Sequence, residues 1–571
     1  MTAVDRKDSK KKKKKEYWRK SSLTEQSVMS EKQSGLVAGL DPEEEVTDVV
    51  CDESELRDGE MMEVEVGDHN VLLVRCDGVY SAISNQCTHY GAPLSKGVLS
   101  GHRVRCPWHG SCFNVKTGDL EEYPGIDCLP CHKVKVENNK VYVSVKKRIQ
   151  GQPKRIKWMG ARDQGVLHTV MLLGGGAASL MCAETLRQEN YGGRIIMVSR
   201  DGLLPYDKTR LSKVMNAESE SLLMRRMDFY HQYDIEVWLK KEALSIDTNK
   251  KTVTFDDGIT QCYDQILIAT GCRAKSLDCP GAGLENVLML ETPEDARSIH
   301  YACMGCRTVV VGTSFVGMEV AAYMIDMASS ITIIGSSELP YQRTLGREIG
   351  KVTMMMLEER GVMFYMNDAV AEVQGENNRV KAVKLKSGIT IEADLLIVGI
   401  GVNPNSEFLK GSPIRMDSKN YVIVDEYMRT NITDIYCAGD LSYFPLKMAK
   451  GQRVTIGHWQ IAQAHGKIAA FSMLRKEVEL NTVPFYWTVL LGRTIRYAGY
   501  GEGYTEIVLK GKFENMKFLA LYLKDDEVVA AAGLNVEPAV SVVAERLAEG
   551  RVITKAEAES DDLSWLKLEP M

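Results

Sequence analysis

The sequence predicts a multidomain fold: a small all-β domain, an α/β part with two glycine-loop domains, and a C-terminal α+β domain. Three observations support this fold class. The chain has 571 residues, enough for roughly three or four domains of about 150 residues each. Short β-type runs separated by turns fill the region before residue 147, and two units of apolar strand, glycine-rich turn and helix follow. From about Val483 the pattern mixes strands with a helix near residues 541–548.

The composition excludes several classes of protein. Lys and Arg total 71 and Asp and Glu total 77, so the formal net charge is −6, and 44% of the residues are hydrophobic. This balance is typical of a globular protein rather than a disordered or collagen-like one. A net acidic chain argues against a dedicated nucleic-acid-binding protein, because phosphate contacts need a basic face. We therefore expect no specific nucleic-acid partner.

The sequence also indicates the compartment. No stretch approaches 18 consecutive apolar residues, so no transmembrane segment is expected. The N-terminus lacks the apolar region of a secretory signal peptide. The 14 cysteines are too sparse for a disulfide-stapled scaffold, and we expect a reducing compartment such as the cytoplasm.

The first predicted segment is a basic arm at residues 1–44. It contains a lysine run from Lys10 to Lys15 and few apolar residues, so it cannot bury enough surface to order itself. A solvated tail is the favoured interpretation, and a nuclear-localisation signal or a contact with an anionic membrane is the alternative. Acidic residues near the lysine run argue against a mitochondrial transit peptide.

A cysteine–histidine pattern marks the all-β domain at residues 45–147. Sixteen residues separate Cys87-Thr-His89 from Cys106-Pro-Trp-His109. Two Cys and two His could bind zinc, but zinc motifs favour two to four residues between paired ligands, and the first pair here has one. The pattern is similar to a Rieske domain, in which two Cys hold one iron of a [2Fe–2S] cluster and two His hold the other. The resemblance makes these four residues the candidate metal ligands.

Four nearby positions distinguish branches of the Rieske family. Ala92 and Trp108 stand where respiratory Rieske proteins carry a disulfide, so the domain resembles the ferredoxin branch. Hydrogen bonds to the cluster sulfurs raise the reduction potential. Ser111 retains one expected donor, whereas Phe113 replaces a tyrosine of the high-potential branch. The resemblance therefore implies a reduction potential below that of the respiratory type.

The first glycine-rich loop follows an apolar strand. Gly174 permits a tight turn, and Gly176 lets backbone N–H groups approach a pyrophosphate at the N-terminus of the next helix. That helix would begin with Ala177 and Ala178. Ser179 occupies the third position of the loop pattern, which is usually a glycine. The glycine pattern alone is only weak evidence for dinucleotide binding, so the interpretation depends on the segments that follow it.

Two later segments supply that context. An Ala-Thr-Gly segment at 269–271 and an Ala-Gly-Asp segment at 438–440 each follow a predicted strand. With the first loop they resemble the pyridine-nucleotide–disulfide-oxidoreductase class of FAD enzymes, flavoproteins with two dinucleotide-binding domains and a glutathione-reductase-like fold. The resemblance implies that Asp440 holds the ribityl chain of FAD. Arg200 stands where an acid would bind a ribose, with Asp201 beside it. The candidate FAD-binding residues are Gly174, Gly176, Ala177, Ala178, Asp201, Ala269, Thr270, Gly271, Gly439 and Asp440.

A second glycine-rich loop follows a strand that ends at Val311 and is expected to bind NADH or NADPH. Gly312 and Gly317 match the expected pattern, but Ser314 replaces the middle glycine, and its Cβ would crowd the pyrophosphate. The acid expected about 20 residues later is replaced by Gly335, so the ribose 2′-OH loses its acceptor. The sequence does not distinguish NADH from NADPH.

The stretch Pro-Tyr-Asp-Lys-Thr-Arg-Leu-Ser before Lys213 resembles the ferredoxin-reductase and apoptosis-inducing-factor branch. The resemblance implies that Lys213 reaches the flavin N5 and pairs with Glu319 of the second loop, so these two are the candidate catalytic residues. A buried charged pair of this kind requires both partners. His458, Trp459 and Trp487 continue the match, and for each tryptophan core packing is an equal alternative to lining the flavin.

From about residue 45 onward the chain resembles the Rieske-bearing members of the apoptosis-inducing factor family. The resemblance implies an FAD-dependent NAD(P)H oxidoreductase that passes electrons through FAD to the cluster and on to an unidentified protein or small-molecule acceptor. It also implies a link to apoptosis and a cytoplasmic or mitochondrion-associated location. The alternative is a catalytically weakened pro-apoptotic signalling or scaffold protein, for which Ser314, Gly335 and Arg200 are the evidence. The sequence does not indicate the oligomeric state.

The predicted domain order combines these motifs. It comprises a disordered basic arm (1–44), a Rieske [2Fe–2S] domain (45–147), a linker (148–167), the first part of an FAD-binding domain (168–295), an NAD(P)-binding domain (296–402), the second part of the FAD-binding domain (403–480) and a C-terminal interface domain (481–571).

Overall fold

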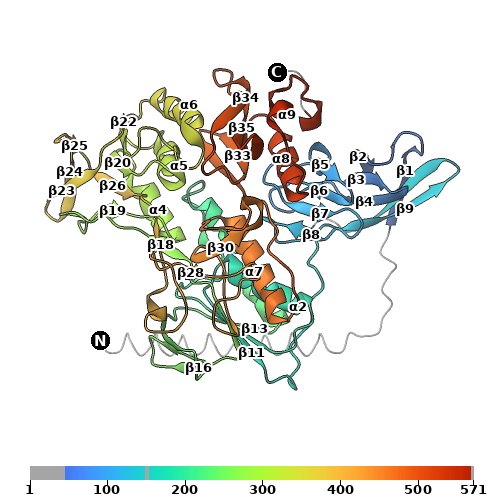
Figure 1. The fold of residues 1–571 in the computed structure, drawn as a ribbon, viewed down its shortest axis with the longest axis horizontal. Helices are drawn as coiled ribbons and strands as arrows, with labels where there is room; N and C mark the ends of the chain where they lie inside the picture. Colours follow the sequence, from blue (N-terminus) through green and yellow to red (C-terminus); the bar gives the residue numbers. More distant parts are fainter. Residues whose placement is uncertain (1–44, 148–153, 568–571) are drawn as a thin grey trace, which may run out of the picture.

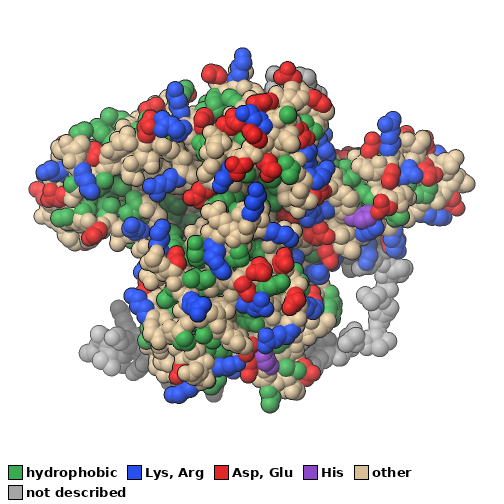
Figure 2. All heavy atoms as spheres, viewed as in Figure 1, with side chains coloured by type: hydrophobic (Ala, Val, Ile, Leu, Met, Phe, Trp, Pro, Cys, Tyr) green, Lys and Arg blue, Asp and Glu red, His purple; other side chains and the backbone are tan. Residues whose placement is uncertain are grey.

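The computed structural model describes residues 45–147 and 154–567, and it confirms the predicted fold class (Figure 1). The predicted basic arm at 1–44 and the linker residues 148–153 lie outside the described residues. Two α/β domains form the body of the molecule, and an antiparallel C-terminal sheet lies between the second of them and the all-β domain. Figure 2 shows basic and acidic side chains interspersed over the same face.

The all-β domain consists of two antiparallel sheets, with strand orders β1-β10-β9-β4-β3-β2 and β5-β6-β7-β8. In β10, Val141, Val143 and Val145 are buried while their neighbours are not, the alternation of a strand with one covered face. The strands are β1 (Glu45–Asp52), β2 (Met61–Val66), β3 (His69–Cys76), β4 (Val79–Ser84), β5 (Val98–Ser100), β6 (Arg103–Arg105), β7 (Cys112–Asn114), β8 (Leu120–Glu122), β9 (Cys131–Glu137) and β10 (Lys140–Lys146). The two Cys–His motifs lie in the loops after β4 and β6.

The first α/β domain has a parallel sheet of order β13-β12-β11-β17-β29. Helices α2 and α7 of this domain pack closely against each other, as a Cβ on Gly466 of α7 would lie only 2.1 Å from the carbonyl oxygen of Ala178 in α2. The elements of this domain are β11 (Thr169–Leu173), β12 (Arg194–Val198), β13 (Ile235–Trp238), β14 (Ala243–Asp247), β15 (Thr252–Phe255), β16 (Thr260–Cys262), β17 (Gln265–Ile268), β28 (Val422–Ile423), β29 (Ile435–Cys437), β30 (Ser442–Leu446), β31 (Gln452–Val454), α2 (Ala177–Gln188), α3 (Met227–Gln232) and α7 (Trp459–Met473).

The second α/β domain is inserted into the first, and the chain leaves and returns through the antiparallel pair β18 (Cys272–Ala274) and β27 (Val402–Pro404). Its parallel sheet has the order β19-β26-β20-β21-β22. Its elements are β19 (Val287–Leu288), β20 (Arg307–Val311), β21 (Ser330–Ile334), β22 (Met363–Tyr365), β23 (Val370–Glu376), β24 (Arg379–Leu385), β25 (Thr390–Glu392), β26 (Leu395–Val398), α4 (Pro293–Ala302), α5 (Phe315–Met324) and α6 (Gly346–Glu358).

The C-terminal domain is an antiparallel sheet of order β32-β33-β36-β35-β34 with two helices. Helix α8 contacts this sheet and also β5 of the all-β domain, so it joins the two (Figure 1). The elements are β32 (Phe485–Leu490), β33 (Arg493–Gly499), β34 (Glu506–Lys512), β35 (Lys517–Lys524), β36 (Glu527–Leu534), α8 (Ala539–Ala548) and α9 (Lys555–Glu559). Among the described residues, no helix is long and apolar enough to cross a membrane.

Candidate redox site

The two Cys–His loops meet at one end of the all-β domain. The Nδ1 atoms of His89 and His109 lie 3.2 Å apart, and Cys87 and Cys106 are each only 1% exposed. Backbone bonds close both loops, since the Cys87 N–H donates to the Ala92 carbonyl at 2.9 Å and the Cys106 N–H donates to the Ser111 carbonyl at 2.8 Å. The structure therefore brings together all four side chains that the sequence places in the two motifs.

The chemistry of these four groups fits an iron–sulfur cluster. Burial lowers the pKa of His89 to about 4 and also lowers the pKa of His109, so both rings are neutral and offer a nitrogen lone pair. The backbone N–H of Trp108 donates to the Cys106 sulfur at 3.5 Å, and such a donor favours a negatively charged sulfur. Two sulfur and two imidazole ligands are the mixed set that a Rieske cluster takes.

The first glycine loop is shaped for close approach. Gly174 has a φ of 122°, and a Cβ there would lie 2.0 Å from the Ala269 carbonyl oxygen, so the loop packs directly on the 269–271 segment. A Cβ on Gly176 would meet nothing within 4 Å, which leaves open space at the N-terminus of α2. Its helix N-terminus offers backbone N–H groups to an anion. These features fit the pyrophosphate of FAD.

The other candidate FAD residues lie at the same edge of the sheet, at the carboxyl ends of its strands. Thr270 Oγ1 donates to the Asn405 carbonyl at 2.7 Å, which joins the two parts of this domain. Burial raises the pKa of Asp440, while Lys208 opposes the shift. Asp201 accepts a hydrogen bond from the Tyr206 hydroxyl at 3.3 Å. Ligands bind at this edge in open α/β sheets.

The second glycine loop keeps two of its three glycines for steric reasons. A Cβ on Gly312 would lie 2.0 Å from the Gly399 carbonyl oxygen, and a Cβ on Gly317 would lie 2.0 Å from the Gly312 carbonyl oxygen. Ser314 is exposed and caps α5 without a side-chain hydrogen bond. Its hydroxyl is therefore available beside the helix N-terminus.

Gly335 directly follows β21, at the position where the sequence pattern leads one to expect an acid that would bind the ribose. A Cβ there would lie 2.6 Å from Thr313 Cγ2 and 2.8 Å from Met366 Cε. These two side chains occupy the space that a carboxylate would need. The packing at the end of β21 therefore fills the place of the carboxylate that would accept a hydrogen bond from the ribose.

Lys213 and Glu319 form a buried ion pair between the two α/β domains. Lys213 Nζ lies 3.0 Å from Glu319 Oε2 and also donates to the Thr209 carbonyl at 3.0 Å. The Glu319 side chain is 4% exposed, whereas Lys213 is 20% exposed. The Ser212 hydroxyl donates to the same carboxylate oxygen, and the Thr488 hydroxyl donates to the other at 2.9 Å. The carboxylate therefore has a hydrogen-bond donor on each of its oxygens.

Strand β32 joins the surroundings of both centres. The ring of Trp487 lies 4.1 Å from the ring of His109 and 5.6 Å from the ring of His89, measured between centroids. The residue before it, Tyr486, stacks on His458 at 4.1 Å, and the residue after it is Thr488. Successive side chains of a strand point to opposite faces, so Trp487 faces the Cys–His loops while its neighbours face the α/β domains.

Trp459, the remaining predicted aromatic residue, begins α7. Its side chain is partly buried and packs against the core of the first α/β domain. Burial lowers the pKa of His458, the residue before it, to about 4. His458 is therefore a neutral ring within the aromatic group around Tyr486.

A buried ion network fixes the all-β domain to α8. Glu545 accepts from Arg103 at 2.6 Å and from Arg105 Nε at 2.6 Å, and both arginines also contact Glu122. Burial alone would raise the pKa of Glu545, but Arg105 and Arg103 outweigh it and hold the pKa below its usual value. On the same helix, Ser541 donates to the Cys106 carbonyl at 2.9 Å. The ligand loop is thus held from α8 directly.

A second ion network fixes the all-β domain to the first α/β domain. Arg225 lies 2.6 Å from Asp127 and 2.9 Å from Glu184, and all three are buried. Beside the ligand loop, the Tyr90 hydroxyl donates to Asp207 at 3.1 Å. These contacts and the α8 network place the all-β domain in one position against the flavoprotein part.

Sequence patterns did not predict several of these residues. Thr488 follows the predicted Trp487 directly, and strand alternation would have assigned the two to opposite faces. The spacing of Arg103 and Arg105 similarly places both side chains on one face of β6. Glu545 carries no local signal, because its partners lie on a distant segment.

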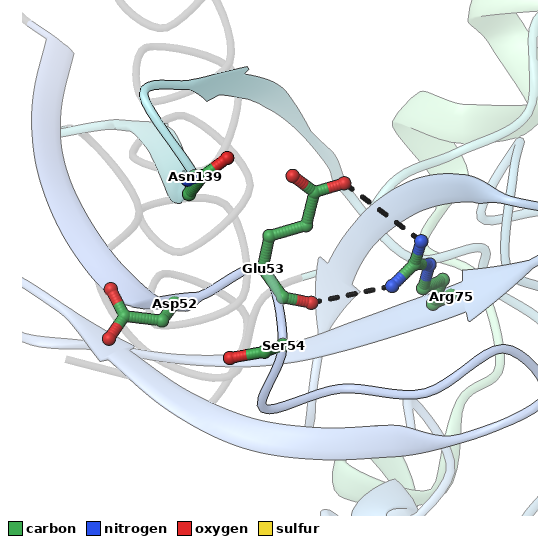
Figure 3. A pocket seen from close by; sticks show the side chains of 5 residues that line it. All are labelled: Asp52, Glu53, Ser54, Arg75 and Asn139. Carbon is green, nitrogen blue, oxygen red and sulfur yellow. Dashed lines mark hydrogen bonds and ion pairs between the residues drawn. The ribbon is translucent and has the colours of Figure 1, made fainter.

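A separate surface depression of about 550 Å³ lies at the far end of the all-β domain (Figure 3). Arg75 there already contacts the side chain of Glu53, at 3.9 Å, and its carbonyl oxygen, at 3.3 Å. Asp52, Ser54 and Asn139 complete the lining. None of these residues belongs to the redox site.

Three stretches of the chain match known protein families. Residues 47–133 match the Rieske [2Fe-2S] domain, residues 168–466 match the pyridine nucleotide-disulphide oxidoreductases, and residues 485–567 match the reductase C-terminal domain. The chain is therefore an FAD-dependent NAD(P)H oxidoreductase that carries a Rieske [2Fe–2S] domain.

Individual relatives narrow the family. Apoptosis-inducing factor 3 of Homo sapiens is 43% identical over 537 residues, which cover 92% of this chain and 89% of that protein. The ferredoxin–NAD(+) reductase subunit of the benzene 1,2-dioxygenase system of Pseudomonas putida is 30% identical and covers 69% of this chain and 95% of its own. The ferredoxin reductase for the CYP199A2 system from Rhodopseudomonas palustris matches with a TM-score of 0.67 and 26% identity, over 70% of this chain and 98% of its own. The chain belongs to the apoptosis-inducing factor 3 family.

Proposed function

We propose that this protein carries electrons from NAD(P)H through FAD to its own Rieske cluster and then to a separate acceptor. The observation that carries the proposal is the pair of neighbours on β32: Trp487 contacts the ring of His109, and Thr488 donates to Glu319, the partner of Lys213. One strand therefore touches the candidate residues of both redox centres. When bound, the flavin takes a hydride from the nicotinamide and releases its electrons singly, as a one-electron cluster requires.

The candidate residues divide this work. Lys213, held by Glu319, supplies a positive charge at the position that the family resemblance assigns to the flavin N5. Gly174 and Gly176 admit the pyrophosphate, and Asp440 faces the cofactor's sugar chain. The Glu319 carboxylate is buried, which strengthens the electrostatic interaction within the pair. The four ligands proposed for the cluster are Cys87, His89, Cys106 and His109.

The final acceptor is proposed to be a separate protein or small molecule that takes single electrons. The relative from the benzene 1,2-dioxygenase system supports a protein acceptor, since it is named a ferredoxin–NAD(+) reductase. The name of the human relative motivates a proposed link to apoptosis. The location is proposed to be cytoplasmic or mitochondrion-associated.

A second candidate function is a signalling or scaffold protein with little turnover. The packing at Gly335 favours it, because Thr313 and Met366 fill the place of the ribose-binding acid. Without that acceptor, nucleotide affinity falls. The two functions differ in whether NADH or NADPH reduces the protein at all.

An anaerobic titration of the purified full chain with NADH, and separately with NADPH, distinguishes them. Visible absorption follows the flavin, and electron paramagnetic resonance follows the reduced cluster. We expect at least one nucleotide to bleach the flavin and to produce the Rieske signal with no added partner. A Cys106→Ser variant with a full flavin content should bleach without that signal. A flavin that stays oxidised with both nucleotides would contradict the electron-transfer proposal.

A further inference from the structure

A hydrogen-bonded chain of side chains leads from the second glycine loop to Lys213. The Tyr341 hydroxyl lies 3.0 Å from the Thr488 hydroxyl, which donates to Glu319 Oε1 at 2.9 Å. A threonine hydroxyl has one proton, so Thr488 must accept from Tyr341 while it donates to Glu319. Glu319 Oε2 in turn accepts from Lys213 at 3.0 Å. The direction of every bond in the chain is therefore fixed.

The chain is buried along its length. Tyr341, Thr488 and Glu319 are 2%, 1% and 4% exposed. Each comes from a different part of the fold: the loop after β21, strand β32 of the C-terminal domain, and helix α5. Buried polar groups are costly to leave without partners, so each hydroxyl restricts the next group in the chain. The carboxylate of Glu319 cannot turn without breaking a bond on one of its oxygens.

The backbone of Tyr341 connects this chain to the nucleotide loop. Its N–H donates to the carbonyl of Thr313, the residue after Gly312, at 2.8 Å. Its φ is 54°, in the left-handed region that a bulky side chain rarely adopts. Such strain persists only where surrounding contacts impose it, and it is often found at functional sites. Tyr341 therefore contacts the second glycine loop through its backbone and, through Thr488, the Glu319 carboxylate that holds Lys213.

We propose that Thr488 and Tyr341 are positioning residues for the reduction of the flavin by the nicotinamide nucleotide. They fix the Glu319 carboxylate, and through it the ammonium group of Lys213, relative to the second glycine loop. Thr488 acts as the main support because it contacts the carboxylate directly. Tyr341 acts through Thr488, because its hydroxyl donates to the Thr488 oxygen and so keeps the Thr488 proton directed toward Glu319. This inference rests on the proposed function, since it concerns the same hydride-transfer step.

Thr488→Val tests the proposal, because it removes the hydroxyl and keeps the shape. We expect the rate of flavin bleaching at saturating nucleotide to fall by about tenfold, as for the loss of one hydrogen bond to a charged group. The nucleotide concentration at half-maximal rate should change by less than about twofold, since Thr488 does not contact the loop itself. The midpoint potential of the flavin should fall, because a less firmly held Lys213 stabilises the reduced, anionic form less.

Three further variants make the result specific. Thr488→Ser restores the hydroxyl and should recover most of the rate, and Tyr341→Phe should cause a smaller loss than Thr488→Val. Thr494→Val is the matched control, a half-buried threonine of the neighbouring strand β33 whose side chain has no hydrogen-bond partner among the described residues. Flavin content and melting temperature are measured for each variant.

The outcomes separate this inference from the proposed function. If the wild type is not bleached by either nucleotide, the proposed function fails and the inference fails with it. If the wild type is bleached and Thr488→Val matches it in rate and flavin potential, only the inference is overturned. Equal losses in Thr488→Val and Thr488→Ser would also overturn it, because the hydroxyl would then not be the relevant group.

Discussion

Phe113 stands where, by the family resemblance, a tyrosine of the high-potential branch would supply a hydrogen-bond donor near the cluster ligands. It is fully buried in the same apolar cluster as Cys87 and Cys106. Phe113→Tyr would add a hydroxyl donor there, and we expect the reduction potential of the cluster to rise by on the order of 60 mV, the equivalent of about 1.4 kcal/mol for one electron. Ser111→Ala should shift the potential the other way. A redox titration followed by electron paramagnetic resonance measures both, and equal potentials in all three proteins would contradict this account.

Gly335 leads to a prediction about nucleotide choice. An acid at this position would accept from the ribose of NADH and repel the 2′-phosphate of NADPH. A hydrogen bond to a charged group contributes about 1.5–3 kcal/mol, so its absence removes roughly ten- to hundredfold of the usual preference for NADH. We expect the dissociation constants of NAD⁺ and NADP⁺ for the oxidised protein to agree within about tenfold. Calorimetric titration tests this, and a preference for NAD⁺ beyond about a hundredfold would be inconsistent with the packing at Gly335.

Local patterns predicted the residues that act through local geometry. Gly174 and Gly312 have positive φ values and no room for a Cβ, and such requirements leave a trace in the sequence. Thr488 and Glu545 have partners that are more than a hundred residues away in the chain. A threonine in a strand or a glutamate on a helix is ordinary in its local context. Only the folded chain shows that their partners are buried and charged.

At the scale of elements, α8 is expected to hold the all-β domain in place. Glu545→Gln removes the charge that faces Arg103 and Arg105, and breaking a buried pair in this way costs about 3–5 kcal/mol. We expect a clear drop in the unfolding free energy of the holoprotein at neutral pH. The difference should shrink as the pH falls below about 4.3, because the lowered pKa of Glu545 stabilises the fold only while the carboxylate is charged. Glu514→Gln, in the turn between β34 and β35, is the control, because Glu514 is exposed and forms no ion pair among the described residues.

Denaturant unfolding monitored by visible absorption measures this difference. If Glu545→Gln and Glu514→Gln lose equal stability at neutral pH, the buried network is not what fixes the domain.

Strand β32 should separate the two electron-transfer steps. Trp487→Leu removes the ring that contacts His109 and leaves the neighbouring Thr488 in place. We expect nucleotide-driven flavin bleaching to keep its rate, while reduction of the cluster slows by on the order of tenfold, about 1.4 kcal/mol of barrier. Rapid mixing with separate detection of flavin and cluster gives both rates. Equal slowing of both steps would indicate general damage to the site rather than loss of a contact between the centres.

At the scale of the whole molecule, the sequence predicted the fold class, because each domain carries its own periodicity and turn residues. The all-β region showed short runs with turns, and each α/β domain showed an apolar strand followed by a glycine loop. How the domains dock was not predictable in this way. The two ion networks that join the all-β domain to the rest each combine residues from separate domains. Within its own domain, each of these charged side chains is indistinguishable in the sequence from an ordinary surface residue.

The fixed position of the all-β domain leads to the central claim, that electrons reach the cluster within one chain. Anaerobic rapid mixing of the full chain with NADH or NADPH at several protein concentrations tests it most directly, with the rate of cluster reduction as the readout. The account predicts a first-order rate constant that does not change with protein concentration. A rate proportional to protein concentration, or a cluster that stays oxidised while the flavin is reduced, would contradict it.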